Sequence, residues 1–556
     1  MKSVRSSGAA KRGAQEAEKK SLQWDLDEVL TELKFGSYQL RNLVLIGLMI
    51  MFSNLYPLSF TLTAADVDYR CKIPECEDNS TKSQFKTSWT SEAIPYNRQE
   101  PYKCKRYKPL SNSTTGFNET HCSALFNSSV EEKCEPAEII YFTDDVTIVN
   151  EFGILCENRK WELSLIGTIN NLAQFIGIPL SGVLSDRYGR KFVAIMCSFL
   201  SAVFGICRGL STNYKMFAAF EFLDAFFGSG IYGTAFILGI ELVNPKMRSL
   251  AATVIGIFYP FGAVIMGCIA WYFKNWRKLL IVSYSPGLFF ILYFWIIPES
   301  VRWLQMNGHH SKAMSILKKI SASNNIELSE KALQQQEEVV SCLPKEEKKE
   351  PFWKPILIIF QTKLIWLRLL NCSFCWFTNT LVYYGLSINS VELVGNKYFN
   401  FVLTNAVEIP AFVLSGFILQ KVSRRMSQSA AFFFSGVACL VCEFVPADMF
   451  WLQLPLFLVS KFLITVSFNI MYVYTAEMFP TELRLSLCGF ASMFGRFGSM
   501  LAPQTILLKD LVGQHAPVLL FGVTSVIAGG LSTSFPETLN KKLPDTVNQA
   551  KMVDES

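Results

Sequence analysis

Three ionisable side chains interrupt long apolar stretches in the second half of the sequence: Glu408, Lys461 and Arg496. A charged group inside a lipid bilayer is costly, so such residues normally face the interior of a helix bundle or a water-filled cavity. There they can bind a small charged molecule, or they can pair with one another and only hold helices together. The sequence leaves both possibilities open. It places all three candidates in the C-terminal half, where we therefore expect the binding charges.

Aromatic side chains accompany these charges at helical spacing. Trp376 and Tyr383 are seven residues apart, which is about two turns of an α-helix, so they share one face. Phe468 and Asn469 follow Lys461 by a further two turns and are expected to line the same wall. An aromatic face attracts an ammonium group by cation–π interaction. Aromatic residues at this spacing also occur in ordinary helix packing.

The elements that must position these residues are apolar blocks long enough to cross a membrane. The chain has 556 residues, of which 50% are hydrophobic and 18% charged. Blocks of about 18–25 apolar residues match a hydrocarbon core of ~30 Å, and only helices satisfy their backbone groups in lipid without a closed barrel. The twelve blocks are 42–63, 162–184, 192–211, 216–242, 250–272, 278–297, 365–388, 398–419, 428–446, 451–474, 485–506 and 516–534. We therefore predict an all-α membrane protein with twelve transmembrane helices.

A long polar insert follows the first block, at 64–160. An even number of cysteines and clustered Asn-x-Ser/Thr sequons are typical of an oxidised, glycosylated exterior domain. The cysteines are Cys71, Cys76, Cys104, Cys122, Cys134 and Cys156, and the sequons begin at Asn79, Asn112, Asn118 and Asn127. No histidine stands at ligand spacing beside the cysteines, so we expect disulfides and no metal. The sequence cannot choose the pairing.

The exterior insert fixes the predicted topology. An even number of spans returns both ends to the cytosol, and basic residues concentrate in the expected cytosolic turns, as the positive-inside rule requires. The predicted division is a cytosolic N-terminus at 1–41, a first transmembrane helix at 42–63, an extracellular loop at 64–160, helices two to six at 162–297, a cytosolic linker with short helices at 298–364, helices seven to twelve at 365–534 and a cytosolic tail at 535–556. The net charge of +6 is attributed to topology, and no nucleic acid is expected as a partner.

Three cytosolic features occur twice at nearly constant spacing, which indicates a duplicated six-helix unit of parallel topology. Gly182-Val-Leu-Ser-Asp-Arg-Tyr-Gly-Arg-Lys191 corresponds to Gly416-Phe-Ile-Leu-Gln-Lys-Val-Ser-Arg-Arg425, and Pro298-Glu-Ser300 corresponds to Pro536-Glu-Thr538. The third pair is a Glu, Pro and Arg set after spans four and ten. The candidate gating residues are Gly182, Asp186, Arg187, Gly189, Arg190, Glu241, Arg248, Glu299, Arg302, Glu477 and Arg484.

The first copy is interpreted as a mechanical latch. Gly182 would let two helices approach closely, and Gly189 would permit a tight turn. Asp186 could pair with a helix N-terminus or a neighbouring arginine in one conformational state only, and so bias inward-open against outward-open forms. Gln420 and Ser423 replace the acidic and the second glycine positions in the other copy, so a weaker latch is expected there.

The latch resembles the signature loop of the major facilitator superfamily. Residues 25–546 resemble the organic ion transporter family, which includes organic cation, organic anion and carnitine transporters. The matching segments include Pro298-Glu-Ser-Val-Arg-Trp-Leu304, Trp376-Phe-Thr378, Tyr383-Tyr-Gly-Leu386, Val407-Glu-Ile-Pro410 and Tyr474-Thr-Ala-Glu-Met-Phe-Pro480. Val301 departs from the family pattern, which usually has proline there. The resemblance implies two pseudo-symmetric six-helix bundles and transport by alternating access.

The resemblance also implies a central pocket lined by Trp376, Tyr383, Glu408, Phe468, Asn469 and Arg496. The Arg496 position is Asp in the archetypal cation transporters and Arg in the anion and carnitine-type members, while Phe412 stands where the anion transporters place Lys. The pocket is therefore similar to that of carnitine-type and insect organic cation transporter-like members. Glu408 and the aromatic residues would hold an ammonium, and Arg496 a carboxylate. We expect a carnitine-like zwitterion or a biogenic amine as substrate, with an organic anion exchanger as the alternative.

Other classes of function fit less well. The chain lacks a Gly-x-x-x-x-Gly-Lys-Ser/Thr loop, which argues against an ATP-driven pump. No histidine lies in a span beside a nucleophile, so we expect neither an enzyme nor a cofactor. A glycosylated receptor would leave the duplication unexplained, and an ion channel would not need a two-copy latch. We expect a multi-pass plasma-membrane protein whose partners are a small organic ion, the lipid bilayer and, where transport is coupled, an ion such as sodium or a proton.

Overall fold

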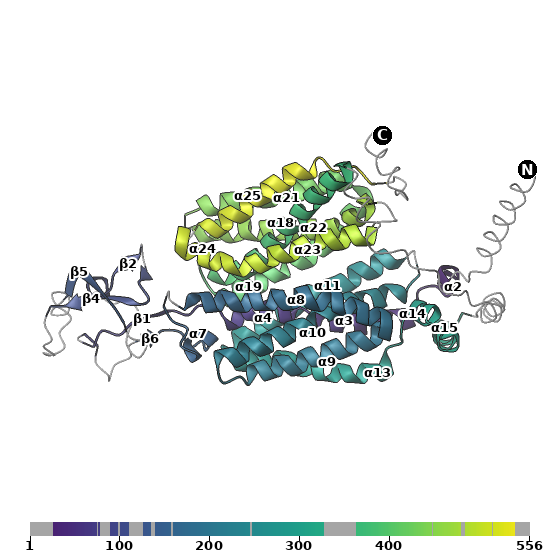
Figure 1. Cartoon of the computed structure of the whole chain (residues 1–556), viewed down its shortest axis with the longest axis horizontal. Helices are drawn as coiled ribbons and strands as arrows, with labels where there is room; N and C mark the ends of the chain where they lie inside the picture. The colour runs from purple at the N-terminus through teal and green to yellow at the C-terminus, as the bar shows by residue number, and fades with distance from the viewer. Residues whose placement is uncertain are drawn as a thin grey trace, which may run out of the picture.

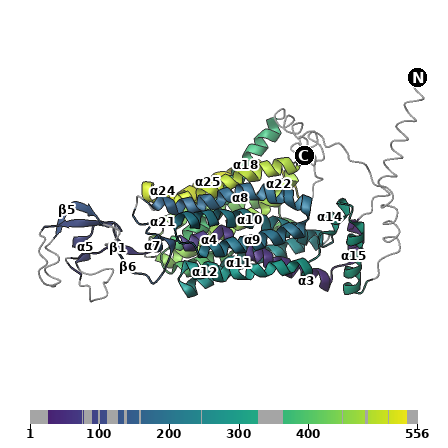
Figure 2. The same cartoon turned by 60° about the horizontal axis from the view of Figure 1, so that its bottom comes forward.

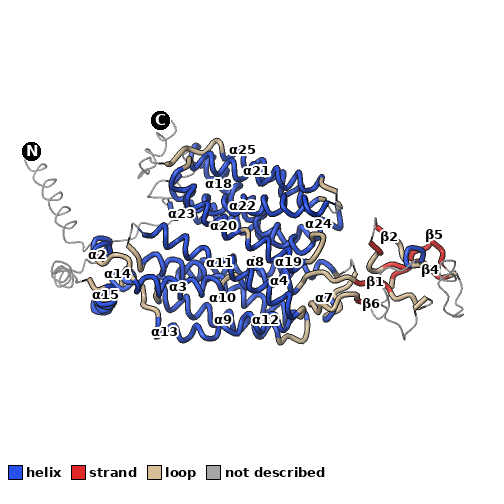
Figure 3. Tube along the Cα trace, turned by 180° about the vertical axis from the view of Figure 1, so that it is seen from behind, coloured by secondary structure: helices blue, strands red, loops and turns tan. Residues whose placement is uncertain are grey.

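The computed structural model describes residues 26–74, 76–77, 89–97, 100–110, 126–134, 139–156, 159–244, 247–326, 363–446, 449–479, 484–513 and 515–539. Its helices form two bundles that lie side by side, one from each half of the chain (Figure 1). The described strands gather at one end of the bundles, as the view from behind also shows (Figure 3). The opposite end carries three short helices, α2 (Leu26–Glu32), α14 (Val301–Met306) and α15 (His310–Asn324).

The first bundle is built from the N-terminal half. Its helices are α3 (Ser37–Phe52), α4 (Leu55–Thr63), α8 (Lys160–Tyr188), α9 (Arg190–Gly209), α10 (Tyr214–Glu241), α11 (Arg248–Phe273), α12 (Trp276–Tyr284), η3 (Ser285–Leu292) and α13 (Tyr293–Ile296). Small residues let α10 approach α8 closely, as is common between membrane helices. A Cβ on Gly177 would lie 2.4 Å from the Phe226 carbonyl oxygen, and one on Gly230 would lie 2.7 Å from Cβ of Ser181.

The second bundle repeats this plan with the C-terminal half. Its helices are α18 (Lys363–Asn389), η4 (Ser390–Glu392), α19 (Lys397–Ala406), α20 (Glu408–Lys421), α21 (Arg424–Phe444), α22 (Phe450–Met478), α23 (Arg484–Leu501), η6 (Ala502–Gln504), α24 (Thr505–Val512) and α25 (Ala516–Ser532). α21 packs against both α22 and α25. The carbonyl oxygen of Gly522 lies 2.7 Å from the point where a Cβ on Gly436 would stand, so α21 and α25 are in close contact there.

Each apolar block predicted from the sequence coincides with one helix or with consecutive helices, which confirms an all-α fold of two bundles. Within the described part of the chain, nine helical segments have the length and composition to cross a membrane, judged on those two criteria alone. α25 is apolar but shorter than the others. The twelve-helix prediction is consistent with this arrangement.

Several spans consist of two helices in sequence. The eighth predicted span breaks at Val407, between α19 and α20, and Glu408 falls in the first turn of α20. Pro410, two residues later, has no N–H to donate, which suits a helix's first turn. A carboxylate there is also favoured by the helix dipole. The break therefore provides a backbone setting in which a buried glutamate is tolerated.

The predicted exterior insert forms small antiparallel β-sheets. The pairs are β1 (Tyr69–Cys71) with β6 (Ile139–Tyr141), β2 (Tyr96–Asn97) with β3 (Glu100–Pro101), and β4 (Lys105–Pro109) with β5 (Phe126–Lys133). Two short helices, α5 (Thr90–Ala93) and α7 (Ile148–Glu151), complete it. Disulfides join Cys71 to Cys134 and Cys104 to Cys156, and Cys76 is also disulfide-bonded. Of the remaining predicted sites, Asn127 lies on β5, partly exposed, and Cys122, Asn79, Asn112 and Asn118 fall outside the described residues.

The short helices at the other end pack on one another and form a second, smaller core (Figure 2). Leu30 and Leu33 of the α2 region pack with Leu317 and Ile320 of α15, and all four are buried. The sequence predicts only a polar cytosolic segment at 1–41, without this packing. Val29, Leu30 and Leu33 are spaced so that they share a face, and this face is covered by the linker helices.

The two bundles meet along two helix pairs. α11 runs beside α19 and α20, and a Cβ on Gly256 would lie 3.0 Å from the ring of Phe412. α8 runs beside α23 and η6, where a Cβ on Gly167 would lie 2.4 Å from Pro503. Residues near the middle of these helices therefore face the opposite bundle.

Candidate functional site

Arg496 lies near the middle of α23 and faces the other bundle. Its Nη1 is 3.3 Å from Oε1 of Gln174 on α8, a hydrogen bond that joins the two halves. Tyrosines surround the guanidinium within electrostatic range, from both halves of the chain: Tyr56, Tyr259, Tyr384 and Tyr472. Among the residues that the structure describes, no ion pair joins Arg496 to a carboxylate, so its positive charge is not neutralised by a described neighbour.

Glu408 and Lys461 form a buried ion pair. Lys461 Nζ is 2.8 Å from Glu408 Oε1, and the side chains are 0% and 1% exposed. Tyr383 donates its hydroxyl hydrogen to the other carboxylate oxygen at 2.7 Å. Lys461 also donates to Ser387 Oγ at 2.7 Å and to the Tyr383 carbonyl at 3.0 Å. Both charges are therefore compensated inside the C-terminal bundle.

Four aromatic rings from α18 and α22 form a continuous cluster beside this pair. Trp376 meets Tyr472 edge-on at a centroid distance of 4.7 Å, and Tyr383 stacks on Phe468 at 5.1 Å. Phe468 touches both Trp376 and Tyr472, so it joins the two pairs. Tyr472 is 50% exposed although it contacts these interior rings. One edge of the cluster, at Tyr472, is therefore not covered by the described part of the protein.

Asn469 follows Phe468 on α22 and contributes a polar edge to this wall. Its Nδ2 atom is buried and has no hydrogen-bond partner among the described residues. The structure thus brings the binding residues predicted in the C-terminal half into one neighbourhood. It separates them into a neutral pair, Glu408 with Lys461, and an uncompensated cation, Arg496.

Contrary to what was expected from the sequence, Glu408, Lys461 and Arg496 are not the only ionisable residues inside the spans. Arg208 of α9 and Glu221 and Asp224 of α10 are 0% exposed in the N-terminal bundle. Arg208 Nη1 contacts the Glu221 carboxylate and lies 3.3 Å from Asp224 Oδ2, to which Tyr284 donates at 2.6 Å. The sequence held a signal, because Glu221 and Asp224 are three residues apart on one helix face and fall inside a predicted span.

A chain of hydrogen bonds connects this cluster with Arg496. Asn170 Nδ2 donates to Glu221 Oε1 at 2.7 Å, and Gln174 Nε2 donates to Asn170 Oδ1 at 2.8 Å. Gln174 then accepts from Arg496. Sequence reasoning missed Gln174 and Asn170. Polar amides four residues apart inside an apolar block were the available signal.

The first copy of the predicted latch forms its contacts within the N-terminal bundle. Asp186 Oδ1 lies 2.7 Å from Arg190 Nη1, and the Asp186 side chain is 76% exposed. Arg190 Nε is 3.8 Å from Glu241 Oε2, which also accepts a hydrogen bond from Ser300. Asp186 therefore pairs with a neighbouring arginine in this conformation.

Glu299 lies against the start of α9. It accepts from the backbone N–H of Lys191 at 3.1 Å and of Ser300 at 2.8 Å. Gly189 adopts a φ of +105° beside this carboxylate, so the tight turn expected there is present. Burial raises the pKa of Glu299, and the backbone hydrogen bonds offset part of that effect.

Other candidate gating residues occupy helix ends. Arg187 places its guanidinium over the ring of Tyr188, at 5.5 Å from the centroid. Arg248 begins α11, and Arg302 is in the first turn of α14. Arg484 begins α23, but its side chain lies outside the described part.

The role expected for Gly182 is wrong in this conformation. A Cβ at this position would meet nothing within 4 Å, and the residue is exposed. The close approach of α8 to α10 instead uses Gly177 and Gly230. Gly182 lies on a different face of α8, which does not point at a neighbouring helix.

The second copy keeps more of the network than its sequence suggested. Glu537 accepts hydrogen bonds from the Ser423 hydroxyl and from the backbone N–H of Arg424 at 3.0 Å. Arg424 Nε lies 3.3 Å from Glu477 Oε2, to which Thr538 also donates at 2.6 Å. Burial alone would raise the pKa of Glu537. The hydrogen bonds from Ser423 and from backbone N–H groups outweigh burial and lower this pKa to about 2.

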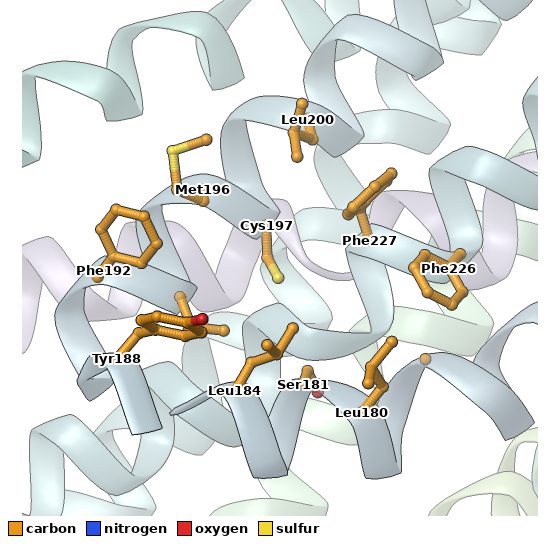
Figure 4. A pocket seen from close by; sticks show the side chains of 12 residues that line it. Leu180, Ser181, Leu184, Tyr188, Phe192, Met196, Cys197, Leu200, Phe226 and Phe227 are labelled. Atoms are coloured by element: carbon orange, nitrogen blue, oxygen red, sulfur yellow. The ribbon is translucent and has the colours of Figure 1, made fainter. Parts of the chain in front are cut away.

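A separate pocket of about 220 Å³ lies on the N-terminal bundle between α8, α9 and α10 (Figure 4). Leucine, phenylalanine and methionine side chains dominate its wall, with Ser181 and Tyr188 as polar members. No ionisable acid or base of the Asp, Glu, Lys or Arg type lines it. It therefore offers no charged group of these types to a ligand.

Comparison with known proteins agrees with this fold and site. The family model described as "Sugar (and other) transporter" matches residues 101–545. The chain is 30% identical to solute carrier family 22 member 21 of Mus musculus, with 95% of this chain and 94% of that protein covered. It is 31% identical to organic cation/carnitine transporter 2 of Rattus norvegicus and 29% identical to the organic cation transporter protein of Drosophila melanogaster, with 94% of each chain covered in both cases.

The family match and these relatives identify the class of the protein as a major facilitator transporter. The chain belongs to the organic ion transporters of solute carrier family 22 within that superfamily. It is a multi-pass membrane transporter and not an enzyme.

Solved structures support the same fold. The xylose transporter XylE from E. coli in a partially occluded inward-open conformation aligns with a TM-score of 0.60 at 15% identity, covering 91% of this chain and all of that one. XylE in an inward-open conformation aligns with a TM-score of 0.54 at 17% identity, covering 71% and 92%. At these identities the likeness concerns the fold alone.

Proposed function

We propose that this transporter carries a small organic zwitterion of the carnitine type, with a carboxylate at one end and an alkylated ammonium at the other. The observation that carries the proposal is the charge state of the site. Glu408 and Lys461 neutralise each other, whereas Arg496 has no carboxylate partner in the described part of the chain. A guanidinium presents paired N–H donors that match a carboxylate. A substrate carboxylate would supply the missing counter-charge.

The aromatic cluster supports a place for the ammonium end. Trp376, Tyr383, Phe468 and Tyr472 present ring surfaces beside one another. An alkylated ammonium on such surfaces gains about 0.5–2 kcal/mol from cation–π attraction, depending on how well water is excluded. The Glu408 carboxylate, which the family resemblance implies as the partner of the ammonium, is engaged by Lys461 and Tyr383 and is better explained as part of the helix packing.

An organic anion is the second candidate, and the same observation supports it. With the Glu408 charge neutralised, the described binding residues carry a net positive charge from Arg496. A carboxylate without an ammonium would satisfy that charge and leave the aromatic rings to hold an apolar body. Phe412 packs against Gly256 at the bundle interface and brings no further cation.

We further propose that transport proceeds by alternating access at the plasma membrane. The bundles are tied on the side of the strands by Gln504, which donates to Thr168 at 2.6 Å, and by an ion pair between Lys397 and Asp145. Such ties favour a form closed on that predicted exterior side. Coupling of transport to sodium or to a proton is part of this proposal.

Radiolabelled uptake in cells tests the proposal. Cells that express the protein are offered L-carnitine, tetraethylammonium and p-aminohippurate, each with and without sodium and at two external pH values. The zwitterion proposal expects uptake of L-carnitine above that of the other two, with Arg496→Gln removing carnitine uptake at equal surface expression. Preferred uptake of p-aminohippurate would favour the anion alternative. Preferred uptake of tetraethylammonium that survives Arg496→Gln would refute both.

A further inference from the structure

The amide of Gln174 has its orientation fixed by groups that only accept hydrogen bonds. Asn170 Nδ2 donates at 2.7 Å to the Glu221 carboxylate and at 2.7 Å to the backbone carbonyl of Tyr56. Neither acceptor can donate, so Asn170 must turn its Oδ1 toward Gln174. Gln174 Nε2 donates to that oxygen at 2.8 Å. The atom left to face Arg496 is therefore Gln174 Oε1, at 3.3 Å from Nη1.

Burial makes this orientation rigid. Asn170 and Gln174 are 0% and 1% exposed, and Glu221 is held by Arg208 in the core of the N-terminal bundle. Flipping either amide would set two donors or two acceptors against each other away from water, which is costly. The charged cluster of the N-terminal half thus determines which atom is presented to the cation of the C-terminal half.

We propose that Gln174 is a positioning and specificity-determining residue of the carboxylate site. Its Oε1 orients the Arg496 guanidinium in the empty transporter, and the substrate carboxylate then takes over this hydrogen bond. The inference rests on the proposed function, because it needs Arg496 to bind a carboxylate. A neutral carbonyl suits this task, since it holds a guanidinium in place without cancelling its charge.

A carboxylate in the same position would act differently. Ion-paired hydrogen bonds are roughly twice as strong as neutral ones, so an internal carboxylate would compete with the substrate for Arg496. Gln174 is the central residue of α8, with as many helical residues before it as after it. The exchange of partners at Arg496 therefore also breaks a contact between the two bundles near the middle of the spans.

The test is the variant Gln174→Glu, assayed for concentration-dependent uptake of L-carnitine and tetraethylammonium. A lost charged hydrogen bond is worth about 1.5–3 kcal/mol, so the KM for carnitine should rise by about tenfold to a hundredfold at 1.36 kcal/mol per factor of ten. The ratio of tetraethylammonium to carnitine uptake should rise with it. Gln174→Met, which removes the hydrogen bond without adding charge, should raise the carnitine KM less than Gln174→Glu does and leave the ratio nearer to wild type.

Gln504→Glu is the matched control, because it makes the same chemical change at another glutamine that joins the two bundles. It should leave the uptake ratio unchanged. The inference is overturned if Gln174→Glu lowers uptake of both compounds by one factor with an unchanged carnitine KM, or if Gln504→Glu shifts the ratio equally. If the wild-type protein takes up carnitine through Arg496 and only the Gln174 variants behave as wild type, the inference alone fails. If Arg496→Gln leaves carnitine uptake intact, the proposed function fails.

Discussion

Lys397 Nζ lies 2.7 Å from Asp145 Oδ2, and this ion pair joins the two halves of the transporter on the side of the strands. Lys397 begins α19 in the C-terminal half, and Asp145 precedes α7 in the N-terminal half. The side chains are only 18% and 11% exposed, so water screens them weakly. The pair can therefore stabilise the form that is closed on this side.

Breaking this pair should shift the transporter toward the form open on the side of the strands. Exposed pairs contribute up to about 1 kcal/mol, and this pair is screened less, so we expect Lys397→Met to move the equilibrium by at least about 1 kcal/mol, which is about a fivefold change in population. A cysteine introduced at Thr168, between the bundles on that side, should react faster with a membrane-impermeant thiol reagent. The charge swap Lys397→Asp with Asp145→Lys should restore the wild-type rate. An unchanged labelling rate in Lys397→Met would contradict this role.

The Glu408–Lys461 pair is expected to serve stability more than binding. Removing one partner of a buried pair leaves an unpaired charge and costs about 3–5 kcal/mol. Lys461→Met should therefore lower the unfolding temperature of the purified protein strongly. Lys461→Met combined with Glu408→Gln should recover most of that loss, because no buried charge remains. Thermal unfolding in detergent measures both. If the decreases in unfolding temperature caused by the two substitutions simply add in the double variant, Glu408 and Lys461 are not coupled.

The spans could be predicted from the sequence because lipid imposes a simple rule on length and polarity. The repeated latch could be located because its residues are close together in sequence, and the Gly189 turn is where it was expected. Pairings between distant helices could not be predicted in this way. Glu408 and Lys461 are on different helices, and only the packing of α20 against α22 decides that they neutralise each other.

Gln174 shows why the rest of the site could not be predicted from the sequence. Its side chain is uncharged, and its meaning depends on Asn170 and on Arg496, which belongs to the other bundle. The prediction that Gly182 lies at a close helix contact was wrong for a related reason. The sequence marks a small residue but does not say which face of the helix meets a neighbour, and Gly182 faces open space. Contacts of this kind depend on helix rotation, which periodicity alone does not fix for mostly apolar spans.

Asp186 should influence rate and not selectivity. Asp186 is exposed in this conformation although its partner Arg190 is mostly buried, so Asp186→Asn should change stability by only about 0–1 kcal/mol. The contact belongs to the conformation described here, so its loss would shift the balance between this conformation and the other one that transport requires. We expect a strong change in uptake rate with the same order of preference among substrates. Gln420→Asp should have a smaller effect. A reordered preference at an unchanged rate would place Asp186 in the binding site.

The insert between the first two spans should be modified and oxidised outside the cell. Disulfides already join Cys71 to Cys134 and Cys104 to Cys156, and Asn127 is partly exposed on β5. Glycosidase treatment should therefore lower the apparent mass on a gel, and Asn127→Gln should remove one step of that shift. The Cys104→Ser variant should reach the surface poorly while the surface fraction keeps its substrate preference. Labelling of this region by a reagent confined to the cytosol would contradict the topology.

The two copies of the Pro-Glu-Ser/Thr motif should respond to pH with opposite signs. The pKa of Glu537 is lowered from 4.5 to about 2, so the unfolded chain binds more protons between these values and stability falls as pH drops through that window. The pKa of Glu299 is raised above 4.5 by burial, so the folded state binds more protons just above that value and stability falls as pH rises through it.

Glu537→Gln should therefore lower the unfolding temperature most near neutral pH and progressively less below pH 4.5. Glu299→Gln should lower the unfolding temperature least near neutral pH and more as pH approaches 4.5. Unfolding temperatures of both variants and wild type, measured from pH 8 down to the lowest pH at which the protein stays soluble, check this. If the unfolding temperatures of the two variants change with pH in the same way, the prediction is contradicted, because the two carboxylates would then have equivalent roles in the two halves.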